Sequence, residues 1–178
     1  MKKNVIVGVT GGIACYKAVE IVNQLNKDGY NVTVVMTANA QKFVCPLTFQ
    51  TMSGNPVVVD TFDINNQIPT IHIDLAKSAD LCLVVPASAN FIGKVASGIA
   101  DDILTTTILA ITSPVIIAPA MNTNMYQNKI VQDNIGKLKK FGYKVLDTDS
   151  GRLACGDIGS GKLLPWEIIV EIAKEYLK

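Results

Sequence analysis

Short apolar runs alternate with helical patterns along most of the chain. The runs are rich in β-branched residues, which is typical of strands that are buried on both faces of a sheet. They predict strands at residues 5–9, 32–36, 57–59, 81–85, 115–118 and 143–146. Between them, apolar residues recur three and four positions apart, and this spacing predicts helices. The expected helices cover residues 14–27, 38–44, 88–97, 102–111, 128–141 and 165–177, with irregular chain at 45–54 and 60–70.

This alternation predicts an α/β fold with a parallel, doubly wound sheet of about six strands. Connections between parallel strands are right-handed, so the helices are expected on both faces of the sheet. Ligands of such folds bind beyond the carboxyl ends of the strands, which directs attention to the segments that follow them. No repeat or linker interrupts the pattern, so we expect a single domain over residues 1–178.

Composition narrows the class of protein further. Hydrophobic residues make up 49% of the chain and charged residues 17%, a composition typical of a protein with a compact core. So high an apolar content also leaves apolar residues on the surface, which favours a homo-oligomer. The net charge of +1 gives no electrostatic reason to expect nucleic acid as a partner. The N-terminal apolar run is too short for a signal peptide, and no run is long enough to span a membrane. A cytoplasmic protein is therefore expected.

Thiols and imidazoles limit the possible metal chemistry. The single histidine excludes a site of several histidines, and the four cysteines form no C-x-x-C pair, so no metal is expected. Cys15 and Cys82 lie within apolar stretches and are expected in the core. No role is predicted for Cys45.

Small residues and amides follow the predicted strands. A glycine turn, Thr10-Gly11-Gly12-Ile13-Ala14, follows the first strand and lets a ligand approach a helix N-terminus closely. Its spacing differs from the G-x-G-x-x-G dinucleotide fingerprint, and Thr37 follows the second strand where an acidic residue would hold a ribose. A terminal phosphate suits this pattern better. Ser88 and Asn122 follow two later strands, where either a helix cap or a ligand contact would explain them.

A glycine-rich segment near the C-terminus contains Cys155. Each glycine adds to the entropic cost of ordering a loop, and loops of this kind often act as mobile flaps. We therefore expect a substrate-covering flap at about residues 148–163, in which the Cys155 thiol is a candidate reagent. An exposed turn with an incidental cysteine is an equally good interpretation of this segment alone.

Three of these segments together point to a family. Pro-Ala-Ser-Ala-Asn, Pro-Ala-Met-Asn-Thr-Asn-Met and Leu-Ala-Cys-Gly-Asp, in this order, resemble the motifs of the flavin-containing cysteine decarboxylases. The resemblance runs from residue 5 to about residue 165. It implies a Rossmann-like (flavodoxin-like) three-layer sandwich that binds FMN and assembles as a homotrimer or homododecamer, with active sites at subunit contacts. The implied reaction is decarboxylation of 4′-phospho-N-pantothenoylcysteine to 4′-phosphopantetheine, a carboxy-lyase step of coenzyme A biosynthesis.

The resemblance also implies a role for each matching position. Cofactor binding falls on Gly12, Ile13, Ala14, Thr37, Asn39, Ser88, Ala89, Asn90 and Ala120. Substrate binding falls on Asn122, Met125, Arg152, Leu153 and Ala154, with Asn122 holding the substrate carboxylate. Cys155 matches the proton donor that completes the reaction. Two positions depart from the family pattern, because Phe91 replaces a threonine and Tyr126 replaces a tryptophan.

His72 is interpreted differently with and without the resemblance. A lone histidine between two isoleucines is more often a core or interface residue. The resemblance makes it the leading candidate for the general base, since a histidine pKa lies near working pH. Lys17 also matches a family lysine, but a solvated role on its helix is equally plausible.

Two other functions are compatible with parts of the sequence. A flavin prenyltransferase on a related fold would not need the Leu-Ala-Cys-Gly segment. A non-catalytic flavin-binding regulatory subunit would not need His72, Asn122 and Cys155 together. We also expect a functional link to a separate phosphopantothenoylcysteine synthetase chain.

Overall fold

The computed structural model describes residues 2–62, 70–154 and 156–178 and contains a five-stranded parallel sheet. The strands are β1 (Asn4–Val9), β2 (Asn31–Met36), β3 (Leu81–Ala87), β4 (Val115–Pro119) and β5 (Lys144–Val145). Their order is β2-β1-β3-β4-β5, and every neighbouring pair is parallel. This order places a topological switch point between β1 and β3, as in flavodoxin-like folds. The predicted α/β class with a doubly wound parallel sheet is confirmed.

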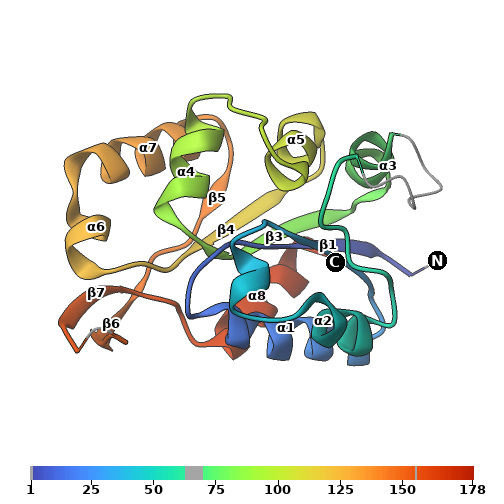
Figure 1. Ribbon diagram of the computed structural model, residues 1–178, viewed down its shortest axis with the longest axis horizontal. Helices are drawn as coiled ribbons and strands as arrows, with labels where there is room; N and C mark the ends of the chain where they lie inside the picture. The colour runs from blue at the N-terminus through green and yellow to red at the C-terminus, as the bar shows by residue number, and fades with distance from the viewer. Residues whose placement is uncertain (1, 63–69, 155) are drawn as a thin grey trace.

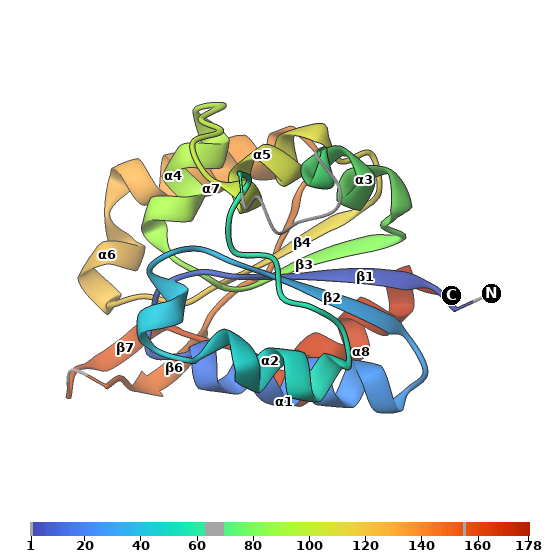
Figure 2. The same ribbon diagram turned by 45° about the vertical axis from the view of Figure 1, so that its right-hand side comes forward.

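Helices cover both faces of the sheet (Figures 1 and 2). One face carries α1 (Cys15–Lys27), α2 (Pro46–Ser53) and α8 (Trp166–Tyr176). The other carries α3 (Ile71–Ser78), α4 (Ala89–Ala96), α5 (Ile103–Ala110) and α7 (Lys129–Lys140). Two shorter helices are η1 (Ala40–Lys42) and α6 (Thr123–Gln127). Across the described residues, no helix combines the length and the apolar character that crossing a membrane requires.

Two hydrophobic cores lie between these layers. Successive residues of a strand point to opposite faces, so β1 contributes to both cores. Val5, Val7 and Val9 pack in the cluster that contains the buried residues of α1 and α8. Ile6 packs in the other cluster, with residues of α4 and α5. The central strands β1, β3 and β4 are therefore apolar along almost their whole length, which is the pattern from which they were predicted.

The predicted count of six strands is wrong by one. Residues 57–59 form no strand, and only Val58 bridges β2, donating to the Val34 carbonyl at 2.9 Å and accepting from Met36 N at 2.9 Å. A three-residue run that follows Pro56 and ends at Asp60 is too short to extend the ladder. The run at 143–146 is likewise reduced to the two residues of β5.

Some elements were absent from the sequence prediction. Helix α2 lies in the segment expected to be irregular, where Pro46 opens it and Gly54, with a φ of 74°, ends it. Helix α3 contains His72, and its buried residues Ile71, Leu75 and Ala76 lie on one face. The glycine-rich segment contains an antiparallel hairpin of β6 (Asp149–Arg152) and β7 (Ile158–Lys162). The segment predicted to be a flap therefore contains two paired strands.

Candidate active site

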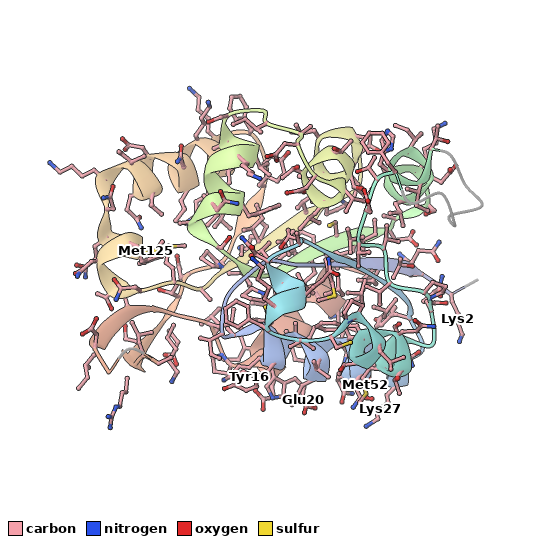
Figure 3. The ribbon with its side chains drawn as sticks, viewed as in Figure 1. Lys2, Tyr16, Glu20, Lys27, Met52 and Met125 are labelled. Atoms are coloured by element: carbon pink, nitrogen blue, oxygen red, sulfur yellow. The ribbon has the colours of Figure 1, made fainter. Side chains whose placement is uncertain are left out.

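A cavity of about 660 Å³ opens at the carboxyl ends of β1, β3 and β4. It therefore lies at the switch point, where ligands of open α/β sheets bind. Helix α1 contributes Tyr16 to its lining, and helix α6 contributes Met125; both residues are labelled in Figure 3. The lining residues are Gly11, Gly12, Ile13, Ala14, Tyr16, Lys17, Ser88, Ala89, Ala120, Met121, Asn122, Met125, Arg152, Leu153, Ala154, Gly161, Lys162 and Leu163.

The first wall is the glycine turn at residues 10–14, and the sheet holds it in place. Thr10 is 1% exposed. Its Oγ1 donates to the Pro86 carbonyl at 2.7 Å and accepts from Ser88 N at 2.9 Å, which joins the ends of β1 and β3. A side chain at Gly11 would place its Cβ 2.5 Å from Cβ of Asn39, so only glycine lets the two loops approach this closely.

The glycine turn presents unused hydrogen-bond donors to the cavity. The backbone N–H groups of Gly11, Gly12, Ile13 and Ala14 donate to no residue that the structure describes. All four residues line the cavity, and they directly precede the 13-residue helix α1. Free N–H groups at the start of a helix bind phosphate well, because the helix dipole adds to their attraction. The donor set therefore fits a terminal phosphate such as that of FMN.

Ser88 and Asn122 are helix caps and cavity residues at the same time. Ser88 Oγ accepts from Phe91 N at 3.3 Å at the start of α4. Asn122 Oδ1 accepts from Asn124 N at 2.8 Å and from Met125 N at 3.4 Å at the start of α6. The two interpretations left open for these residues are therefore compatible. Phe91 is buried in the core at 2% exposure, so its departure from the family pattern does not alter the lining.

The second wall is the β6–β7 hairpin. It is anchored to the connection between β4 and α6, where Met121 N donates to the Gly161 carbonyl at 2.9 Å. Thr123 Oγ1 donates to the Ser160 carbonyl at 2.8 Å. A Cβ at Gly161, whose φ is 105°, would lie 2.5 Å from the Met121 carbonyl oxygen. Nearer its turn, Asp157 Oδ2 accepts from Asn122 Nδ2 at 3.0 Å.

The charges around the cavity favour an anionic ligand. Lys17, Arg152 and Lys162 line it, whereas its lining contains no Asp or Glu among the residues that the structure describes. Lys162 is paired with Asp149 at 3.3 Å, but Lys17 and Arg152 form no ion pair within the described part of the chain. Unpaired cations beside free N–H groups suit a ligand with more than one anionic group.

The structure brings most of the predicted site residues together. Eleven predicted cofactor and substrate positions line the cavity, namely Gly12, Ile13, Ala14, Ser88, Ala89, Ala120, Asn122, Met125, Arg152, Leu153 and Ala154. Thr37, Asn39 and Asn90 do not line it, although Asn39 packs beside Gly11. Cys155 lies outside the described residues.

His72 lies far from this cavity within one chain. It is on α3, at the opposite end of the molecule from the β6–β7 hairpin in both ribbon views (Figures 1 and 2). Its Nδ1 atom is buried and forms no hydrogen bond with any described residue. The residue as a whole is half-buried, so another part of its ring remains accessible.

Sequence reasoning missed several lining residues. Tyr16, Met121, Lys162 and Leu163 line the cavity but were given no site role. Met121 lies between the predicted residues Ala120 and Asn122, and Tyr16 follows Ala14 by two positions, so a small extension of each motif would have found them. Lys162 and Leu163 reach the cavity only because the hairpin folds back onto β4 and α6, and no local pattern reports that contact.

The buried cysteines are poorly suited to chemistry at this site. Burial raises the pKa of the Cys15 thiol, against the opposing effect of backbone hydrogen bonds, and Sγ donates to the Thr10 carbonyl at 3.0 Å. Burial raises the pKa of the Cys82 thiol to about 12. Both thiols are held in the protonated, unreactive form at neutral pH. They are core residues, as the sequence predicted.

Comparisons with known proteins show the family to which the chain belongs. The model of the Flavoprotein family matches residues 1–178, and the chain belongs to that family. It is 50% identical over 174 residues to the coenzyme A biosynthesis bifunctional protein CoaBC of Bacillus subtilis (strain 168). That match covers 98% of this chain and 43% of the relative, so the chain spans less than half of that protein's length.

A shorter relative is matched over its whole length. The chain is 47% identical over 179 residues to a probable phosphopantothenoylcysteine decarboxylase of Streptococcus mutans serotype c, covering 99% of this chain and 100% of the relative. Among solved structures, a PPC decarboxylase cysteine-to-serine mutant complexed with pantothenoylaminoethenethiol has a TM-score of 0.89 at 29% identity, with 99% of each chain covered. The FMN-dependent cysteine decarboxylase SpaF has a TM-score of 0.83 at 28% identity, with 99% and 98% covered.

Proposed function

We propose that this protein binds FMN and decarboxylates 4′-phospho-N-pantothenoylcysteine to 4′-phosphopantetheine in coenzyme A biosynthesis. The observation that carries the proposal is the combination, in one cavity, of the free N–H groups at residues 11–14 with the amide of Asn122. The first feature fits the FMN phosphate and the second fits a carboxylate. The names of the CoaBC and decarboxylase relatives, and the FMN in the name of SpaF, support the same assignment.

The chain's own residues bind the cofactor and exclude water from it. FMN, when bound, supplies the two-electron oxidant that lets a cysteine carboxyl leave as CO₂. The N–H groups of Gly12, Ile13 and Ala14 would hold its phosphate, and Ser88 and Ala89, which line the same cavity, would contribute to its binding. Exposed Ile13 and Tyr16 leave an apolar rim at the cavity, which suits contact with the ring or with another subunit.

Asn122 orients the substrate carboxyl. Its Oδ1 is occupied by the backbone of α6, so its Nδ2 hydrogens are directed away from the helix. A neutral amide holds the carboxylate by hydrogen bonds. A cationic side chain in its place would stabilise the carboxylate and oppose its loss as CO₂. Arg152, Leu153 and Ala154 on the hairpin cover the substrate.

His72 acts in the cavity of a neighbouring subunit. Since α3 and the hairpin lie at opposite ends of one chain, His72 and Asn122 meet only across a subunit contact. His72 is only half-buried, so its side chain keeps accessible surface for a contact with another subunit. There the imidazole takes the proton that leaves in the first oxidation. We infer a homotrimer or a multiple of three, as the family resemblance implies.

Cys155 supplies the final proton. In the sequence it follows the predicted substrate residues Arg152, Leu153 and Ala154. The product needs a proton at carbon after CO₂ has left. A thiol is a far stronger acid than a serine hydroxyl, so Cys155→Ser is expected to release CO₂ but to stall at reduction. Reduced flavin and an enethiol then accumulate. Undiminished formation of the saturated thiol product would remove Cys155 from the mechanism.

Reconstitution tests the cofactor and the reaction together. The purified protein, stripped of cofactor, is mixed with FMN, FAD or NAD, and retained cofactor is measured by absorbance after gel filtration. We expect FMN to be retained, and the FMN form to release CO₂ from 4′-phospho-N-pantothenoylcysteine. Retention of NAD in preference to FMN, or an FMN form without CO₂ release, would contradict the proposal.

Mixed oligomers test the shared site. His72→Asn and Asn122→Asp proteins are each expected to be nearly inactive. When they are dissociated, mixed and reassembled, some sites combine His72 of one chain with Asn122 of another, and activity returns. If both residues served the same chain, mixing would restore nothing. Light scattering that shows a monomer at micromolar concentration would also contradict the shared site.

The pathway around the enzyme follows from its relatives' names. The bifunctional CoaBC protein of Bacillus subtilis is more than twice as long as this chain's match. We infer a functional link to phosphopantothenoylcysteine synthetase activity, and a cytoplasmic location where thiol substrates stay reduced.

A further inference from the structure

One contact joins the hairpin to the residue proposed to bind the substrate carboxylate. Asn122 Nδ2 donates to Asp157 Oδ2 at 3.0 Å, although the two residues are 35 positions apart in the chain. Asp157 is exposed, whereas Asn122 is half-buried at the cavity. A carboxylate of the protein itself therefore lies where the proposed function requires a carboxylate of the substrate.

The direction of the Asn122 amide is set by its helix. Asn124 N and Met125 N both point at one end of the side chain, so that end must be the oxygen. Its NH₂ end is consequently presented away from α6, towards the hairpin and the cavity. This arrangement selects an acceptor, and an ionised acceptor forms the strongest hydrogen bond there.

The backbone of the hairpin turn places Asp157 at that amide. Leu153 N donates to the Asp157 carbonyl at 2.8 Å, and Gly156 N donates to the Leu153 carbonyl at 2.9 Å. The base of the hairpin is held separately, by Gly161 and Ser160 against the connection between β4 and α6. The docking of the hairpin base therefore does not depend on the hydrogen bond between Asp157 and Asn122.

We propose that Asp157 is a positioning residue whose carboxylate holds the place of the substrate carboxylate at Asn122 and leaves when substrate binds. This inference rests on the proposed function. Asp157 keeps the amide oriented and the hairpin turn close to the cavity before substrate arrives. A ligand that lacks a carboxylate brings nothing to replace this hydrogen bond, so Asp157 stays at Asn122 when such a ligand binds.

A matched pair of ligands tests this exchange. 4′-Phospho-N-pantothenoylserine keeps the carboxylate but carries a hydroxyl in place of the thiol, so it binds without entering the oxidation. 4′-Phospho-N-pantothenoylethanolamine is the same molecule without the carboxylate. Calorimetry on the FMN-loaded protein measures both dissociation constants. In Asp157→Asn, we expect the serine ligand to bind about fivefold more tightly, because a neutral side chain competes less and repels less.

The second ligand and two further variants make the outcome specific. Binding of the ethanolamine ligand is expected to stay unchanged in Asp157→Asn, and Asp157→Ala is expected to favour the serine ligand in the same direction. Asp147→Asn removes the same charge from an 89% exposed side chain that is paired with Lys139, and it should alter neither ligand. Equal changes for both ligands, or weaker binding of the serine ligand, would contradict the proposal that the substrate carboxylate replaces Asp157 at Asn122.

The proposed function is judged separately, by CO₂ release from the true substrate in the wild-type protein. If the wild-type protein releases CO₂ but the Asp157 variants change the binding of both ligands equally, only the proposal for Asp157 is overturned. If wild type neither releases CO₂ nor binds the serine ligand, both proposals are overturned.

Discussion

The glycine turn at residues 10–14 and the β6–β7 hairpin both line the cavity, but only the turn is tied into the sheet. Thr10 is 1% exposed and joins the ends of two strands, whereas Ile158 on the hairpin is 82% exposed. Met121, Thr123 and Asn122 each donate a hydrogen bond to the hairpin. The wall assigned to the cofactor is therefore tied to the core through Thr10, and the wall assigned to the substrate is attached at the end of the sheet.

Two glycines with the same close approach give the strongest test of this difference. Gly11→Ala places a Cβ 2.5 Å from Asn39 Cβ, and the clash falls in the wall that belongs to the core. We expect the free energy of unfolding to fall by about 1–3 kcal/mol and FMN to be lost. Thermal unfolding and flavin absorbance measure both effects. Gly12→Ala is the control, since its Cβ would meet nothing within 4 Å, and its stability should match wild type.

Gly161→Ala carries the matching clash in the hairpin, 2.5 Å from the Met121 carbonyl oxygen and at a φ of 105°. We expect the hairpin to undock while the sheet stays folded, so FMN is retained and the Michaelis constant for substrate rises. Limited proteolysis between residues 149 and 162 reports the undocking. Loss of FMN to the same degree as in Gly11→Ala would show that the two walls are not separable.

Asn122→Asp changes the contact between the substrate wall and its ligand. The new carboxylate faces both Asp157 and the substrate carboxylate, and like charges at this distance repel. We expect binding of the serine ligand to weaken about tenfold, with little change for the ethanolamine ligand and none in FMN retention. Equal weakening of the two ligands would argue against a carboxylate at Asn122.

Thr123→Val should have the smallest effect, because it removes one anchoring hydrogen bond and keeps the side-chain shape. The lost bond is the one from Thr123 Oγ1 to the Ser160 carbonyl. We expect a cost of about 1 kcal/mol, confined to the hairpin. Amide hydrogen exchange should accelerate in β7 and not in β1 or β3. Faster exchange throughout the sheet would contradict the separation of the walls.

Most of the fold was predictable because its strands are buried on both faces. The runs at 5–9 and 81–85 are almost wholly apolar, and they became β1 and β3 in the expected arrangement. The failures came where pairing depends on distant partners. Residues 57–59 look like a strand locally, yet only Val58 finds a partner on β2. The hairpin was missed because its glycines carry no apolar alternation.

The candidate site was predictable to the extent that its residues lie in motifs next to strand ends. Ser88 and Asn122 follow β3 and β4 directly, and both reach the cavity. Lys162 comes to the cavity through the fold of the hairpin alone. His72 was found by resemblance, and neither its helix nor its distance from the cavity was visible in the residues around it.

The position of α3 has a consequence for how this enzyme behaves on dilution. Under the proposed assignment, a single chain carries the base at one end and the cavity at the other, so it is incomplete by itself. Specific activity would then depend on protein concentration, falling where subunits separate and rising again as they reassociate. Only the assembled oligomer would contain complete active sites, so assembly would be required for activity.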